Sequence, residues 1–311
     1  MLSDLTLVSS FQTNIQIYPS HKRVVPNDKL SKRAFFLDPA MFTDLIDKNA
    51  SADITEVKNH PKFGTVKSTL HINFDPERCI IRTPPTQFDF AVLCVCISEW
   101  VHGNRYTTPA IIFRGLTGKI GKTDSDNSLS EKQRKFILQS IDKLMGNIIT
   151  VDITNLCQKL KYNGGKPKTI KSPLLPCKYI TSVINGQTVD TIYLTDESPL
   201  FTLAVLKNNQ IISYDATLLD APNINNSELN ITIKNYVMNR VQEIKSHSLN
   251  PSLTFSDIFQ KCGINDADLK TKKRARDTVF KFLDHLVSEN VIKSYQVIKK
   301  FNAFYSVKIS Y

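Results

Sequence analysis

The alternation of apolar and polar positions is clearest over about the last sixty residues of the chain. A short helix is predicted at 255–262, because Ser252 or Thr254 can cap its start and Gly263 can close it in the left-handed conformation. After a polar turn, a long helix is predicted at 269–290, where apolar residues recur at helical spacing. These residues are Ala275, Val279, Phe282, Leu283 and Leu286.

The period of the apolar positions shortens after residue 290 and predicts a two-stranded hairpin. Alternation over 303–311 indicates one strand, residues 291–297 supply its partner, and Lys299 and Lys300 lie near the tip. A further helix is predicted at 232–246. The order of helix, short helix, long amphipathic helix and hairpin is that of a winged-helix domain.

The same order is predicted earlier in the chain. A buried helix at 88–101 is followed by a helix that starts near Pro109 and ends between Gly115 and Gly118. Ser130 and Gln133 have the spacing of a capping box, so a third helix is predicted at 131–145, with a strand at 148–153. The lysine-rich segment 159–178 falls where the hairpin of a winged helix is expected.

Further strands are predicted between the two helical regions. Strands at 179–184 and 188–194 flank Asn185-Gly186, a strong hairpin signal, and strands at 200–206 and 211–214 follow. We therefore predict an α+β fold with two winged-helix domains and β-hairpin insertions. The first domain spans 87–220, the second spans 228–311, and 1–86 form an N-terminal extension without an assigned role.

The charge of the chain indicates which kind of partner the predicted fold would bind. The chain has 40 Lys and Arg against 29 Asp and Glu, a net charge of +11 and an isoelectric point near 9.3. Ten basic and three acidic residues lie between 269 and the final tyrosine. Because an α-helix fits the major groove of B-DNA, we expect duplex DNA as the partner. The alternative is a solvated basic face on a helix that packs for structural reasons.

Candidate DNA-binding residues follow from the predicted helices and hairpins. We expect most of them to contact phosphate, and a few near the helix N-termini to read guanine edges. In the second domain they are Lys270, Lys272, Lys273, Arg274, Arg276, Lys281, Lys299 and Lys300. In the first domain they are Lys132, Lys135, Gln139, Lys166 and Lys168.

The composition of the chain indicates its cellular compartment and the state of its cysteines. The chain has no run of eighteen apolar residues and no signal-peptide pattern, so we expect a cytoplasmic protein without a membrane partner. Six scattered cysteines without a C-x-x-C pair are typical of free thiols in a reducing compartment. They favour neither a disulfide framework nor a zinc site.

Motifs for catalysis bear on the alternative that the protein is an enzyme. The sequence has no P-loop and no H-E-x-x-H or G-x-S-x-G motif, so we predict no catalytic residue, metal or cofactor. Nickase initiators use a histidine pair and a tyrosine near a lysine. Tyr162 and Lys166 have a similar spacing, but His71 has no second histidine beside it. A nickase remains the enzymatic alternative.

The two predicted domains resemble the iteron-binding plasmid replication initiators over about 87–311. The resemblance is carried by that architecture, by the run Lys272-Lys273-Arg274-Ala275-Arg276-Asp277 leading into Phe280-Lys281-Phe282-Leu283, and by Tyr305-Ser306-Val307-Lys308-Ile309. It implies a protein that binds repeated origin sequences, opens the duplex and recruits host replication proteins without cleaving DNA. It also implies a shift between a monomer and an autorepressing homodimer. A transcriptional repressor that binds an operator through the same surface is the alternative.

Overall fold

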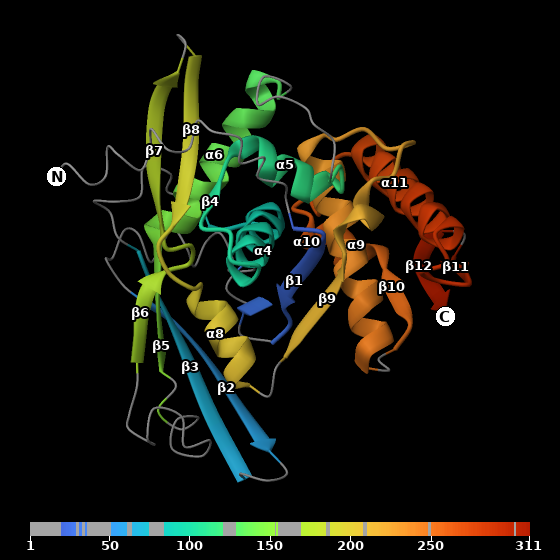
Figure 1. Cartoon of the computed structure of the whole chain (residues 1–311). Coiled ribbons are helices and arrows are strands. Elements are labelled where there is room, and N and C mark those ends of the chain that lie inside the picture. The colour runs from blue at the N-terminus through green and yellow to red at the C-terminus, as the bar shows by residue number, and fades with distance from the viewer. Residues whose placement is uncertain are drawn as a thin grey trace, which may run out of the picture.

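The chain forms a mixed α+β structure with several small antiparallel sheets around central helices, seen in a computed structural model (Figure 1). The described residues are 20–28, 31–32, 35, 51–60, 64–74, 84–120, 129–152, 154, 169–184, 187–207, 210–247, 250–301 and 303–311. Within them, no helix combines the length and the apolar character needed to cross a membrane.

The first unit consists of three helices and a three-stranded sheet. Its elements are α4 (Gln87–Val101), β4 (Tyr106–Thr107), α5 (Pro109–Thr117), α6 (Glu131–Gly146), β7 (Cys177–Ile184) and β8 (Gln187–Leu194). The predicted capping box of α6 is present, since Ser130 and Gln133 each accept a hydrogen bond from the other's backbone N–H. The helices at 88–101, 109–118 and 131–145 are thus confirmed to within two residues.

The second unit repeats this order of elements. It contains α9 (Glu228–His247), β10 (Ser252–Thr254), α10 (Phe255–Lys261), α11 (Leu269–Ser288), β11 (Ser294–Lys300) and β12 (Ala303–Ser310). Its sheet has the strand order β10-β12-β11, and the sheet of the first unit has the order β4-β8-β7. In both units the short strand after the first helix therefore pairs with the last strand of the hairpin.

This topology corrects the predicted hairpin of the first unit. The hairpin equivalent to β11–β12 is β7–β8, and not the lysine-rich segment 159–178. The strand directly after α6, β5 (Asn147–Asp152), instead joins β2 (Ser51–His60), β3 (Gly64–Phe74) and β6 (Thr169–Pro173) in a four-stranded sheet. Both edges of β5 are paired, one with β3 and the other with β6, so β5 cannot also be a strand of the hairpin.

The strand predicted at 200–206 is also wrong, because that segment forms helix α8 (Pro199–Leu206). The run is apolar at almost every position, and such a run has no period that separates strand from helix. Pro199 suits the first turn of a helix, and Leu200, Leu203 and Ala204 are buried at helical spacing. The following strand is present as β9 (Ile211–Asp215).

Part of the N-terminal extension packs into the first unit. Strand β1 (Lys22–Pro26) pairs antiparallel with β9 and packs on α4. The buried Arg23 side chain donates a hydrogen bond to the carbonyl oxygen of Gly115 in α5. The ring of Phe35 lies 4.9 Å from that of Phe90. Val24, Val25 and Phe35 of this extension thus contribute to the same core as α4.

Helix α9 connects the two units. The buried amide of Asn235 donates hydrogen bonds to the carbonyl oxygens of Leu116 in α5 and of Ile231, at 3.0 and 2.9 Å. The buried Lys234 ammonium donates to the carbonyl oxygen of Leu219 at 2.8 Å, just before the segment 220–227 that joins the units. Gly118 is required here, because a Cβ atom on it would lie 2.4 Å from the backbone nitrogen of Asp220.

The described cysteines are free thiols, as predicted. Cys94 and Cys96 are buried in α4, and Cys177 and Cys262 are partly buried. Burial raises the pKa of the Cys94, Cys177 and Cys262 thiols to about 12. Cys79 and Cys157 lie outside the described residues.

These thiols predict a loss of stability in alkali. Above a pH of about 9 the unfolded chain releases thiol protons that the folded chain keeps, so the free energy of unfolding falls as pH rises. Cys94→Ala should remove about 1–2 kcal/mol of the loss between pH 8 and pH 10, measured by urea unfolding under reducing conditions. Val92→Ala in the same helix should destabilise the protein equally at both pH values. An identical pH slope for wild type and Cys94→Ala would contradict this assignment.

Candidate nucleic-acid interface

Helix α11 is oriented by the apolar stripe that the sequence predicts. It begins at Asp268, whose carboxylate accepts a hydrogen bond from the backbone N–H of Thr271 at 2.6 Å. The stripe residues are buried, and the helix packs against α9. The Thr278 hydroxyl donates to Asn230 of α9 at 3.0 Å. The opposite side of α11 is therefore held toward solvent.

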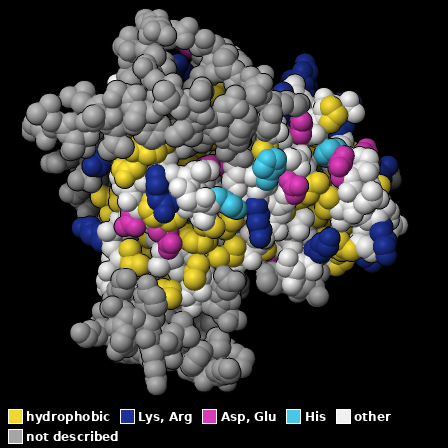
Figure 2. Space-filling view, viewed as in Figure 1, with side chains coloured by type: hydrophobic (Ala, Val, Ile, Leu, Met, Phe, Trp, Pro, Cys, Tyr) yellow, Lys and Arg dark blue, Asp and Glu magenta, His cyan; other side chains and the backbone are white. Residues whose placement is uncertain are grey.

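That outer side carries the predicted cations. Lys270, Lys273, Arg274 and Lys281 are exposed, whereas Lys272 and Arg276 are half-buried beside the stripe. Among the described residues, none of these six side chains forms an ion pair with a carboxylate. Figure 2 shows Lys and Arg side chains along the side of the molecule that carries α11, with a few carboxylates between them. Uncompensated charge of this kind suits an anionic ligand.

The hairpin adds two more exposed cations next to aromatic rings. The Arg276 guanidinium lies 4.8 Å from the centre of the Phe304 ring, and the Lys299 ammonium lies 4.9 Å from it. The Lys300 ammonium lies 3.7 Å from the centre of the Tyr305 ring. Such contacts hold a cation in place while leaving it solvated. The role of Phe304 was missed from sequence, where its position between Ala303 and Tyr305 indicated only a strand.

Aromatic packing fixes the hairpin to α11. The Phe280 ring of α11 stacks on Tyr295 of β11 with centroids 6.4 Å apart and also contacts Phe304 of β12 at 5.7 Å. The Tyr295 hydroxyl donates a hydrogen bond to the Asp284 carboxylate at 2.7 Å. Burial, together with this carboxylate, raises the pKa of Tyr295 to about 12. The aromatic cluster of Phe280, Tyr295 and Phe304 therefore supports the cations of both α11 and the hairpin.

The first unit presents a smaller basic surface. Lys132, Lys135 and Gln139 of α6 are exposed, as predicted. Arg134 is turned to the hairpin, where it donates to the Asp190 carboxylate of β8 at 2.6 and 3.1 Å. Lys143 pairs with Asp89 of α4 at 3.3 Å. Half of the basic residues of α6 are thus used inside the unit, and the predicted contacts Lys166 and Lys168 lie outside the described residues.

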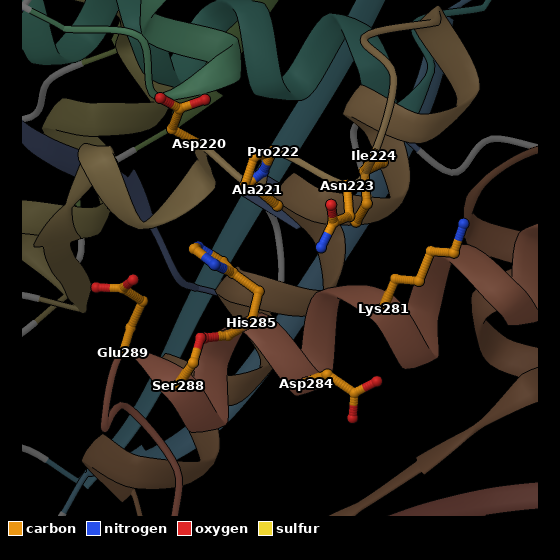
Figure 3. Close-up of a pocket in the computed structure, with 10 residues that line it drawn as sticks. All are labelled: Asp220, Ala221, Pro222, Asn223, Ile224, Lys281, Asp284, His285, Ser288 and Glu289. Atoms are coloured by element: carbon orange, nitrogen blue, oxygen red, sulfur yellow. The ribbon is translucent and has the colours of Figure 1, made fainter.

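A groove of about 520 Å³ lies beside the cationic face, between α11 and the segment 220–224 (Figure 3). His285 points toward that segment, and its Nε2 atom lies 3.1 Å from the carbonyl oxygen of Leu218. Lys281 and the carboxylates of Asp220, Asp284 and Glu289 line the same groove. This mixture of charges does not define an anion site, and the groove marks where the connecting segment rests on α11.

The enzymatic alternative from the sequence names His71 and Tyr162. The described residues contain no cluster of His, Cys, Asp or Glu that could hold a metal ion. His71 lies in β3, and Tyr162 lies outside the described residues.

Two crystal structures are similar to this chain at low sequence identity. The chain is similar to a crystal structure of RctB domains 2 and 3, with 14% sequence identity, coverage of 86% of this chain and 96% of that chain, and a TM-score of 0.40. A structure of selenomethionine derivatives of the same two domains gives 14% identity, coverage of 83% and 90%, and a TM-score of 0.39. Comparisons with protein-family models and with curated proteins find no match.

The shared aromatic support predicts the effect of removing Phe304. Phe304→Ala should lower the free energy of unfolding by about 2 kcal/mol, because the ring packs against Phe255 and Phe280 and carries two cations. Amide hydrogen exchange should accelerate in β11 and β12 more than in α4. Tyr305→Ala, which removes a more exposed ring, should cost less than about 0.5 kcal/mol. Equal effects of the two substitutions would show that Phe304 does not support the hairpin.

Proposed function

We propose that this chain is a non-catalytic, sequence-specific protein that binds double-stranded DNA through two winged-helix domains, one at 87–220 and the other at 228–311. We further propose that it acts in the cytoplasm as a replication initiator of a plasmid or other mobile element. It would bind repeated origin sequences, open the duplex and engage host replication proteins.

The observation that carries the DNA-binding proposal is the outer face of α11. Its exposed, unpaired cations lie on a helix that is the right size for the major groove, and a basic hairpin is fixed beside it. Lys270, Lys273 and Arg274 occupy the first turns, where a recognition helix reaches base edges and the backbone N–H groups favour phosphate. Lys281 and the hairpin lysines are placed for phosphate contacts.

Two units on one chain favour an extended, non-palindromic site. Asn235 and Lys234 hold α9 against the first unit, so the two recognition surfaces keep a defined separation. A second contact made by the same chain adds affinity without the entropy of a second association. Because the units differ in sequence, the chain itself has no two-fold symmetry to match an inverted repeat. This arrangement, with the resemblance to iteron-binding initiators, supports direct origin repeats over an operator.

Reversing two charges on α11 tests the DNA-binding surface. Lys273→Glu with Arg274→Glu should weaken specific binding by about 2 kcal/mol or more and lower the dependence of affinity on salt. Duplexes enriched by the wild-type protein from a random library supply the probe, and fluorescence anisotropy supplies the affinity. Lys22→Glu with Lys245→Glu is the matched control, since both lysines are exposed and lie outside α11 and its hairpin. Equal weakening by the two pairs would exclude α11 as the recognition helix.

An experiment with the DNA that flanks the gene distinguishes an initiator from a repressor. On a supercoiled plasmid carrying that DNA, the protein should protect short direct repeats and make an adjacent A·T-rich segment sensitive to single-strand-specific nuclease. Protection of an inverted repeat over a promoter, without melting, would instead identify a repressor. Magnesium-dependent nicking that is lost in Tyr162→Phe would contradict the non-catalytic part of the proposal.

A further inference from the structure

The tip of the β11–β12 hairpin carries an exposed aromatic ring. The relative solvent exposure of the Phe301 residue is 103%, the highest value among the exposed large apolar residues in the described part of the chain. Its φ angle is +49°, in the left-handed region that glycine or asparagine occupies more readily than an aromatic residue. Stability of the hairpin alone therefore does not account for phenylalanine at this position.

Two lysines flank this ring on opposite faces of the hairpin. Lys299 and Lys300 are consecutive in β11, so their side chains leave the strand on opposite sides. The Lys299 ammonium lies over Phe304, whose ring contacts Phe280 of α11, and the Lys300 ammonium lies over the exposed ring of Tyr305. The tip is thus an apolar wedge with one cation on each side.

This arrangement matches the cross-section of a DNA minor groove. The groove is about 6 Å wide and has a phosphate backbone along each wall, with the edges of the bases at its floor. A hairpin that enters with one ammonium toward each wall would place the Phe301 ring at the base pairs. Protein surfaces that recognise other proteins gain little from a single ring between two lysines, because interface cores are depleted of charge.

We propose that Phe301 enters the minor groove next to the major groove occupied by α11 and wedges between two adjacent base pairs. The inference rests on the proposed DNA-binding function and adds to it a residue that bends the duplex. Apolar wedges of this kind unstack a base step and kink the duplex toward the major groove. Pyrimidine–purine steps deform most easily, so Phe301 selects a TA or CA step without a hydrogen bond to it.

The test compares wild type with Phe301→Asn and Phe301→Leu on the duplex that the wild-type protein enriches from a random library. Energy transfer between dyes at the two ends reports bending, and 2-aminopurine placed at each step in turn reports unstacking. Phe301→Asn should abolish both signals and weaken binding roughly 5- to 30-fold, with the salt dependence unchanged. Phe301→Leu should retain part of both signals, because leucine is also an apolar wedge.

The controls distinguish a failure of the Phe301 wedge from a failure of the proposed DNA binding. Asparagine tolerates a positive φ angle, so Phe301→Asn should unfold at the same or a higher urea concentration than wild type. Val205→Ala removes an exposed apolar side chain of α8 and should change neither binding nor bending. Failure of the wild-type protein to enrich any duplex would refute DNA binding itself. Bending that is equally strong with Phe301→Asn would overturn the wedge and leave DNA binding intact.

Discussion

The burial of one side of α11 against α9 is the constraint on which the rest depends. Phe282, Leu283 and Leu286 are fully buried in that contact, so the helix has one orientation about its own axis. The charged positions lie on the remaining surface because the helical period places them there. A different rotation would bury unpaired lysines, at a large cost in desolvation. The exposed cationic face is thus a consequence of packing the apolar stripe.

The same plan is built twice with different chemistry. In the first unit, the third helix is fastened to its hairpin by an ion pair between Arg134 and Asp190. In the second, stacked rings and the hydrogen bond from Tyr295 to Asp284 do this, and the cations remain available. The Arg134 charge is therefore paired within its own unit, whereas Arg276 rests on the Phe304 ring with its charge unpaired. This difference makes the second unit the stronger candidate for the main contact with the proposed DNA ligand.

Helix α9 couples the two surfaces through the core. Asn235 bonds to the end of α5, and Lys234 bonds to the carbonyl oxygen at which the connecting segment begins. Burial lowers the pKa of Lys234 to about 8, and the nearby Asp220 partly offsets that effect. Polar groups buried at such a junction must all find partners, and this requirement favours one relative placement of the units. In Figure 1 the hairpins β7–β8 and β11–β12 lie on opposite sides of the view.

The sequence by itself determined the elements whose signals are local. The stripe of α11, the capping box at Ser130 and the pairing of β7 with β8 all depend on neighbours within a few residues, and each is present. Tertiary structure decided the remainder. Segment 200–206 has no period and became α8, because its burial is set by strands distant in sequence. The hairpin of the first unit was misplaced because β5 pairs with β3, a contact that no local pattern encodes. Phe301 and Phe304 likewise differ only in what the folded chain places beside each ring.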